Sequence, residues 1–451
     1  MHRTVFATIC LALLCAVPAM ISAQYTDEWY TEGNFEPLRR IKLTVRNTLT
    51  VTRENCPVVV KREQLSYQNT AQRTITVVDP SLPSNPEPTK EQLRLLSGYL
   101  IRKEKGGHFI EYQMDDIDKD GFWDELFFMT NLKPREEKTI YLYIGKSERG
   151  LYKHKTHANI GYYGRHMVAF WESEFMGWKL WYPMSVDLHG KRQPMLTAYP
   201  EYQTNLSGYY MPFELGTDIM TVSSTFGNGG IGLFEVPADS DSISRPSYDY
   251  NTGKGPLEAP RYAFDVVLNG PLRSMIRVKT MNWYTGSGYY ELEQYYTAYS
   301  SKSYATCDVR FTRFLAPHND VAFCCGIRRI MTEYKSENRG GTAISYGKDV
   351  TIRIPDEDIG DEGLVLDFEG IAIVVKDEYR PEYMNIDTHG GNHVFKVPVT
   401  MDKSFEYMIL GGWSEGTVNR TEKDFREYVL KASMEYNYPP EVTAGKMEDK
   451  K

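Results

Sequence analysis

Acidic, basic and aromatic side chains alternate closely between His166 and Glu201. Carboxyl and imidazole groups can exchange protons with sugar hydroxyls or with a glycosidic oxygen, and indole rings can stack on the face of a pyranose. We therefore predict that this segment lines a carbohydrate site. Its predicted catalytic residues are Glu172, Asp187 and His189, and its predicted substrate-binding residues are Trp171, Lys179, Trp181 and Lys191.

Two reaction classes fit such a site. Paired carboxyl groups flanking the scissile bond are the arrangement of a glycoside hydrolase. A histidine or tyrosine base beside a uronate carboxyl would instead give elimination, as in a polysaccharide lyase. Arg273 and Arg277 stand four residues apart in a strand-like run, hence on one face, where they could bind that carboxylate bidentately. The pattern does not choose between the reactions, and a glycan-binding protein without activity is a further alternative.

Each of these side chains also has a structural interpretation. Glu172 and Glu174 share one face of an alternating strand, and such a face is more often solvated. Trp178 and Trp181 belong to a residue type that is usually packed in a core. The clustering of the residues is therefore what favours a site over ordinary packing.

An acidic loop carries the second candidate site. It reads DIDKDGFWD over residues 116–124, and alternate carboxylates on a tight turn converge their oxygens on one point. Phe127 stands where a helical calcium hand needs a glutamate, so we predict a structural calcium site between two strands, with a solvated acidic hairpin as the alternative. No organic cofactor is expected. The predicted ligands are Asp116, Asp118, Asp120 and Asp124.

Strand patterns dominate the elements that must position these residues. Polar and apolar side chains alternate from Ile41 to Val45, and further strand-like runs continue to Gly145. We predict an N-terminal β-sandwich over residues 24–147 that contains the acidic loop. Short strands separated by turn residues recur over residues 158–437, which predicts a large antiparallel sheet or stacked sheets.

One helix is predicted near the C-terminus. Thr421 can cap it, and Phe425, Val429 and Ala432 fall on one face of it. Residues 438–451 are predicted to be a disordered tail.

The first residues predict export. Arg3 precedes an apolar run, Val5–Ala19, and small residues lead to a cleavage site after Ala23, so residues 1–23 read as a signal peptide. No later run approaches the roughly 20 apolar residues that span a bilayer. The mature protein is therefore predicted to be secreted or periplasmic, with no membrane contact after cleavage.

The composition excludes one class of partner. The formal net charge is -8, and lysines and arginines are dispersed among carboxylates. Nucleic acid requires a concentrated basic face, so it is not an expected partner. The four cysteines that remain after cleavage allow three disulfide pairings, and the sequence does not choose among them. They are Cys56, Cys307, Cys324 and Cys325.

Five motifs follow one another in the order and spacing of one bacterial family. The chain resembles the family called domain of unknown function 4861 over nearly all of its mature length. The resemblance implies a small N-terminal β-sandwich followed by a supersandwich similar to galactose mutarotase. It also implies a secreted protein that accompanies the breakdown of polysaccharides, with pectin or other uronate polymers as the expected partners. The motifs are 115–126 (DDIDKDGFWDEL), 171–174 (WESE), 187–191 (DLHGK), 215–218 (LGTD) and 270–274 (GPLRS).

The resemblance adds Asp218 to the catalytic candidates. Relatives carry an arginine where Lys179 stands, and residues 181–185 and 199–210 also depart from the family pattern, which implies altered specificity or lost activity if those segments form the active centre. The combined prediction is an exported glycoside hydrolase or polysaccharide lyase for acidic oligosaccharides, or a glycan-binding protein without activity. The residues that the resemblance implies for the cleft are Glu172, Lys179, Asp187, Lys191, Asp218 and Arg273.

Overall fold

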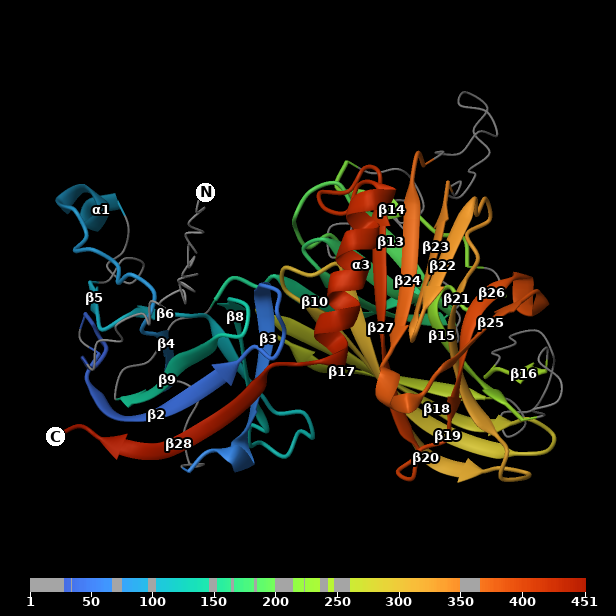
Figure 1. Cartoon of the computed structure of the whole chain (residues 1–451), viewed down its shortest axis with the longest axis horizontal. Helices are drawn as coiled ribbons and strands as arrows, with labels where there is room; N and C mark the ends of the chain where they lie inside the picture. The colour runs from blue at the N-terminus through green and yellow to red at the C-terminus, as the bar shows by residue number, and fades with distance from the viewer. Residues whose placement is uncertain are drawn as a thin grey trace, which may run out of the picture.

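The chain is mostly β-sheet, as predicted, and its strands form a small sandwich and a larger assembly of stacked sheets (Figure 1). The predicted signal peptide, residues 1–23, lies outside the described residues. The computed structural model describes residues 28–33, 35–66, 75–95, 103–145, 152–163, 166–181, 185–198, 214–222, 224–235, 242–246, 260–348 and 366–451.

The small sandwich has two antiparallel sheets, ordered β28-β2-β9-β4-β6 and β3-β8-β7. Alternate residues Ile41, Leu43 and Val45 of β2 are fully buried, so the inner faces of the two sheets meet in one core. The elements are β1 Thr31–Glu32, β2 Pro37–Arg46, β3 Arg53–Lys61, η1 Arg62–Gln64, β4 Ile75–Asp79, α1 Lys90–Leu95, β5 Glu104–Lys105, β6 His108–Phe109, β7 Tyr112–Asp115, β8 Glu125–Leu132, β9 Glu137–Gly145 and β28 Glu441–Asp449.

The C-terminal residues complete this sandwich. β28 pairs antiparallel with β2, and an ion pair between Arg40 and Glu448 at 2.7 Å joins the two strands. Figure 1 shows β28, in red, beside the blue β2. The prediction of a disordered tail over residues 438–451 is therefore wrong for Glu441–Asp449. An edge strand buries little of itself, so its sequence carries only a weak apolar alternation.

The larger part contains three antiparallel sheets, ordered β10-β11-β12-β13-β14, β16-β15-β21-β26-β25 and β17-β18-β19-β20-β27-β24-β23-β22. A parallel bridge between Val186 and Gly227 connects the first two sheets. The elements are β10 Thr156–Tyr163, β11 His166–Ser173, β12 Met176–Trp181, β13 Ser185–Lys191, β14 Gly216–Asp218, β15 Asn228–Phe234, β16 Ile243–Ser244, β17 Arg261–Asn269, β18 Arg273–Tyr284, β19 Tyr289–Tyr299, β20 Tyr304–Leu315, β21 Ala322–Arg328, β22 Lys335–Arg339, β23 Thr342–Gly347, β24 Glu369–Val375, η3 Asp377–Tyr379, β25 Glu382–Ile386, η4 Thr388–Gly390, β26 Asn392–Pro398 and β27 Ser404–Trp413.

The main core lies between the eight-stranded sheet and the two five-stranded sheets. Trp178 enters it from β12, Ile231 from β15 and Ile276 from β18, and all three are buried. Burial of such side chains stabilises the stacked layers, because each removes apolar surface from water. This arrangement confirms the predicted stacked antiparallel sheets.

Helix α3 (Glu422–Asn437) covers the outer face of the eight-stranded sheet. The Thr421 side chain caps it by accepting a hydrogen bond from the Asp424 N–H, and Phe425, Val429 and Ala432 are buried against the sheet. In Figure 1 the helix stands between the two parts of the molecule. Within the described ranges, no helix has the length and hydropathy needed to cross a membrane.

The cysteines are separate buried thiols. Cys324 and Cys325 are adjacent in β21, and burial raises the pKa of the Cys325 thiol well above its usual value. None of the four described cysteines forms a disulfide, so the sheets are held by packing and backbone pairing. The four are Cys56, Cys307, Cys324 and Cys325.

Candidate functional site

One face of the sheet β10–β14 carries most of the predicted site residues. Side chains alternate between the faces of a strand, so Glu172 of β11 and Lys179 of β12 point to the same side. The register then places Lys179 opposite Asp187, and His189 opposite Asp218. We call this surface the polar face. It brings together Glu172, Lys179, Asp187, His189, Lys191 and Asp218.

Trp171 lies on the other side of that sheet, in the main core. Its ring stacks on Tyr296 with 4.4 Å between the centroids, and it is fully buried. An indole packed in the core cannot stack on a sugar, so the prediction that Trp171 binds substrate is wrong. The cause is the strand alternation itself, which points neighbours Trp171 and Glu172 to opposite faces. The side chain of Trp181, the other predicted platform, lies outside the described part of the chain.

Glu172 is the most heavily hydrogen-bonded carboxylate of the polar face. Lys191 contacts its Oε2, His157 Nδ1 lies 3.2 Å from its Oε1, and the backbone N–H groups of Thr197 and Ala198 donate to it at 2.9 Å and 3.2 Å. Burial alone would raise the pKa of this carboxyl, but the Lys191 ammonium and these hydrogen bonds outweigh it and lower the pKa to about 2. Glu172 is therefore a permanent carboxylate at neutral pH.

Asp187 and Asp218 form a second group around Lys179. The Lys179 ammonium lies 2.8 Å from Asp187 Oδ2 and 3.3 Å from Asp218 Oδ2. Burial and the adjacent Asp187 raise the pKa of Asp218 well above its usual value, although Lys179 and the Met220 N–H act in the opposite direction. Asp218 also shares a hydrogen bond with Asp187. A carboxyl group whose pKa is raised keeps its proton at a higher pH than an ordinary aspartate, which is the property of a proton donor.

The polar face is covered. Its six predicted residues are each at most 4% exposed. Part of the cover is the chain just after β13, because Lys191 donates to the Met195 carbonyl at 3.0 Å, and Thr197 and Ala198 bind Glu172. A reactant would therefore reach these groups only where this cover leaves access.

Sequence reasoning missed His157. It lies in β10 directly opposite Glu172 in the register, and its side chain is 19% exposed. The run THANIGYY gives no sign of this role, because the role depends on which strand pairs with β11. A histidine at one hydrogen bond from a buried carboxylate can hold or pass a proton.

Arg273 and Arg277 share a face, as predicted, but not the polar face. Arg273 Nη2 lies 2.6 Å from both Asp115 Oδ2 and Glu125 Oε2 of the small sandwich. Arg277 pairs with Asp265 at 3.4 Å. These side chains lie on the outer face of the eight-stranded sheet, with the main core between them and the polar face. The predicted grip of both arginines on a substrate carboxylate at that site is therefore wrong.

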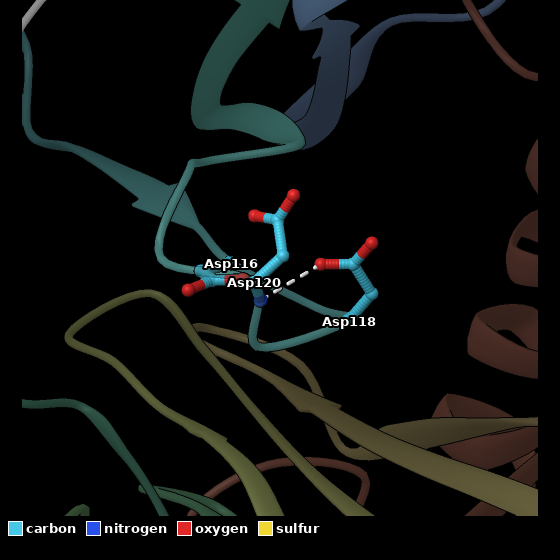
Figure 2. Close-up of side chains that lie close together, drawn as sticks. All are labelled: Asp116, Asp118 and Asp120. Carbon is cyan, nitrogen blue, oxygen red and sulfur yellow. Dashed lines mark hydrogen bonds between the residues drawn. The ribbon is translucent and has the colours of Figure 1, made fainter.

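The acidic loop gathers three of its four predicted ligands. One oxygen from each of Asp116, Asp118 and Asp120 lies within 4.8 Å of the others (Figure 2). The Asp120 N–H donates to Asp118 Oδ1 at 3.1 Å, and Gly121 adopts a φ of 91°, which favours glycine and permits the tight turn. Carboxylate oxygens this close repel one another, and a hard divalent cation would relieve the repulsion.

Asp124 has a different place in that loop. Its Oδ2 accepts hydrogen bonds from the N–H groups of Ile117 at 2.7 Å and Asp118 at 3.3 Å. It therefore holds the turn and does not belong to the group of three. Calcium binding by the remaining carboxylates stays a prediction.

A family model described as Domain of unknown function (DUF4861) matches residues 45–442. The chain belongs to this family. The match confirms the resemblance seen in the sequence, and it runs from β2 in the small sandwich into β28. The acidic loop and the polar face are thus both parts of the DUF4861 region.

Two solved structures from Enterococcus faecalis resemble the DUF4861 chain. One is an alpha-mannosidase from strain V583, with a TM-score of 0.48 and 9% identity, covering 91% of this chain and 46% of that one. The other is a protein in glycosyl hydrolase family 38, with a TM-score of 0.47 and 9% identity. The match covers 91% of this chain and 48% of that one. The chain spans about half the length of each. No curated protein matches the chain.

Proposed function

We propose that this DUF4861 protein is an exported enzyme acting on acidic oligosaccharides, as a glycoside hydrolase or a polysaccharide lyase. The observation that supports this proposal is the Asp187–Asp218 pair around Lys179. A proton held between two buried carboxyl groups is available to a leaving oxygen, and the carboxylate that remains can accept one back.

The pKa directions assign the roles. Asp218 is the proton donor, because its raised pKa keeps it protonated where an ordinary aspartate is ionised. Asp187 is its partner across Lys179. Glu172 cannot be a proton donor near neutral pH, because its pKa is lowered to about 2. Its role is to fix Lys191 and His157 on the same face.

The proposal that the substrate is acidic rests on Lys179 and Lys191. Arg273 and Arg277 lie elsewhere, and Lys179 and Lys191 supply two ammonium groups on the polar face. Each already contacts a carboxylate of the chain. A uronate would therefore bind by sharing an ammonium group, with the protonated Asp218 placing no second negative charge against it.

The test uses the mature protein, a panel of pectic and other uronate oligosaccharides, and mass spectrometry. Hydrolysis adds one water to the summed product mass, whereas elimination leaves the sum unchanged and gives an unsaturated product that absorbs in the ultraviolet. Wild-type protein should give one of these products, and Asp218→Asn and Asp187→Asn should not. Full turnover by both variants would refute the assignment.

The burial of the polar face weighs against catalysis there and leaves a second candidate, a glycan-binding protein without activity whose binding surface lies elsewhere. Catalytic groups must touch their substrate, and the six predicted residues of this face are each at most 4% exposed. This candidate predicts saturable binding of an oligosaccharide from the same panel, with no change in the mass of any component after long incubation.

Export is part of the proposal and has its own test. The motif at residues 1–23 supports it. N-terminal sequencing of the protein recovered from the periplasm or the medium should begin at Gln24. Recovery in the cytoplasm with Met1 in place would contradict export without affecting the assignment of the polar face.

A further inference from the structure

A cavity lies where the small sandwich, the eight-stranded sheet and helix α3 meet, and none of the six polar-face residues lines it. Its volume is about 310 Å³, near the lower end of the roughly 300–1,000 Å³ range of small-molecule sites. The small sandwich contributes Cys56 and Phe127, the sheet contributes Tyr304, and α3 contributes Glu435. A smaller cavity of about 130 Å³ adjoins it and shares Tyr304 and Glu435. We call the two together the junction cavity.

Aromatic side chains from four elements line the junction cavity. Phe127 comes from β8, Tyr299 from β19, Tyr304 from β20 and Tyr436 from α3. Phe127 and Tyr299 lie 6.0 Å apart between ring centroids, and Tyr299 and Tyr304 lie 5.7 Å apart. Such rings offer flat apolar faces, with hydroxyl groups at the edges of the tyrosines.

Two cations that line the junction cavity already have partners within the chain. Arg53 donates to Asn47 Oδ1 at 2.8 Å and to the backbone carbonyl oxygens of Glu435 and Tyr438. Lys376 forms an ion pair with Glu406. A charged ligand would therefore have to break one of these contacts, and a neutral ligand would not.

The carboxyl group of Glu435 offers an acceptor atom without a hydrogen bond. Glu435 Oε1 is buried and has no hydrogen-bond partner among the described residues, and Lys431 Nζ lies 4.0 Å from it. A buried acceptor without a partner costs about 1–3 kcal/mol, so a ligand hydroxyl that donates to it would be favoured. Burial also raises the pKa of this carboxyl, which reduces its charge, although Lys302 and Lys431 oppose the shift.

We propose that the junction cavity is a binding site for a single neutral sugar ring, separate from the polar face. The ring faces would stack on Tyr299 and Tyr304, and a hydroxyl would donate to Glu435 Oε1. The size of the cavity fits one ring better than a chain, and a neutral sugar can enter without breaking the contacts of Arg53 and Lys376. The proposal does not depend on the activity assigned to Asp187 and Asp218.

Two variants test the cavity. Val59 lines its wall from β3 and is 36% exposed, so Val59→Phe adds bulk to the cavity with little disturbance of the core. Leu38→Phe is the matched control, because Leu38 is 45% exposed on β2 and does not line the cavity. Glu435→Gln keeps the size of the side chain and removes the acid. A cooperative thermal unfolding transition in each variant would show that the variant is folded.

The probes are glucose, galactose, mannose and xylose, titrated separately into the full-length mature protein by calorimetry and by saturation-transfer NMR. We expect saturable binding of at least one sugar, loss of that binding in Val59→Phe, and retention in Leu38→Phe and in Asp218→Asn. Glu435→Gln keeps one acceptor oxygen and replaces the other by an NH₂ donor, so it should weaken binding by at most about tenfold. Absence of saturable binding by all four sugars, or equal binding by wild type, Val59→Phe and Glu435→Gln, would overturn the proposal.

Discussion

Asp187 and Asp218 share the ammonium group of Lys179, which lies 2.8 Å from the first carboxylate and 3.3 Å from the second. The three side chains come from β13, β14 and β12, which are neighbours in one sheet. The strand register brings the three side chains together. It places Lys179 of β12 directly opposite Asp187 of β13, and β14, which carries Asp218, pairs with the other edge of β13. Two acids with one cation cannot both be ionised at low cost, so the sheet itself holds a proton at this point.

Asp218→Asn should lose activity and gain stability at high pH. Turnover should fall by about 10²–10⁴-fold, the usual contribution of a proton donor. Because the pKa of Asp218 is raised in the folded protein, folding takes up a proton. The stability of the wild type therefore declines as the pH rises above the pKa that Asp218 has in the unfolded chain. Urea unfolding at about pH 4 and about pH 8 should show that the free energy of unfolding of the variant rises relative to that of wild type as the pH increases. A gap independent of pH would contradict this.

Glu172→Gln should show the opposite pH dependence. The folded pKa of Glu172 is about 2 and the ordinary value is 4.5, so its stabilising effect is complete above about pH 4.5 and is lost as pH falls toward 2. At neutral pH the variant should be less stable than wild type by about 3 kcal/mol. Denaturant unfolding measures this difference, which should shrink in acid. Glu427→Gln, at a side chain 67% exposed, should change stability little at any pH.

Arg273→Met should destabilise the junction between the two parts. Arg273 is buried and binds Asp115 and Glu125, so its loss leaves two carboxylates without their cation, at a cost of about 3–5 kcal/mol. Arg277→Met is the matched control on the same strand face. The Arg277 side chain is 39% exposed and its pair with Asp265 should be worth at most about 1 kcal/mol. Equal losses in urea unfolding would show that the junction does not depend on Arg273.

Calcium should raise the unfolding temperature through the acidic loop. A cation that binds only the folded chain stabilises it in proportion to the logarithm of its concentration. Thermal unfolding with calcium and with a chelator should differ in wild type and in the control Asp320→Asn. The difference should vanish in Asp118→Asn and Asp120→Asn, which each remove a member of the group. An unfolding temperature unaffected by calcium in wild type would contradict the site.

Local pattern was sufficient for several elements. The alternation of Ile41, Leu43 and Val45 identified a strand whose inner face is buried, and Thr421 with Phe425 and Val429 identified the capped helix. These features depend on neighbours in the sequence, within reach of periodicity and capping rules.

The position of the site residues was harder to predict, because it depends on the fold as a whole. Periodicity shows that Trp171 and Glu172 point opposite ways, but both faces of β11 are buried, so it cannot show which faces the core. The side chain of Arg273 is of a type that often binds substrate carboxylates. Only the packing of the small sandwich against the sheet shows that Arg273 is already paired with Asp115. His157 became visible only when β10 was paired with β11.

The pairing of β28 with β2 has a consequence for how the chain acquires its structure. The first strands of the small sandwich are synthesised early, yet β2 gains its outer neighbour only from Glu441–Asp449, which are synthesised much later. Until then one margin of that sheet presents unsatisfied amide and carbonyl groups, a surface prone to association with other chains. The earliest strands made are thus protected late, and a nascent chain would benefit from remaining unfolded, or chaperoned, until β28 has been synthesised.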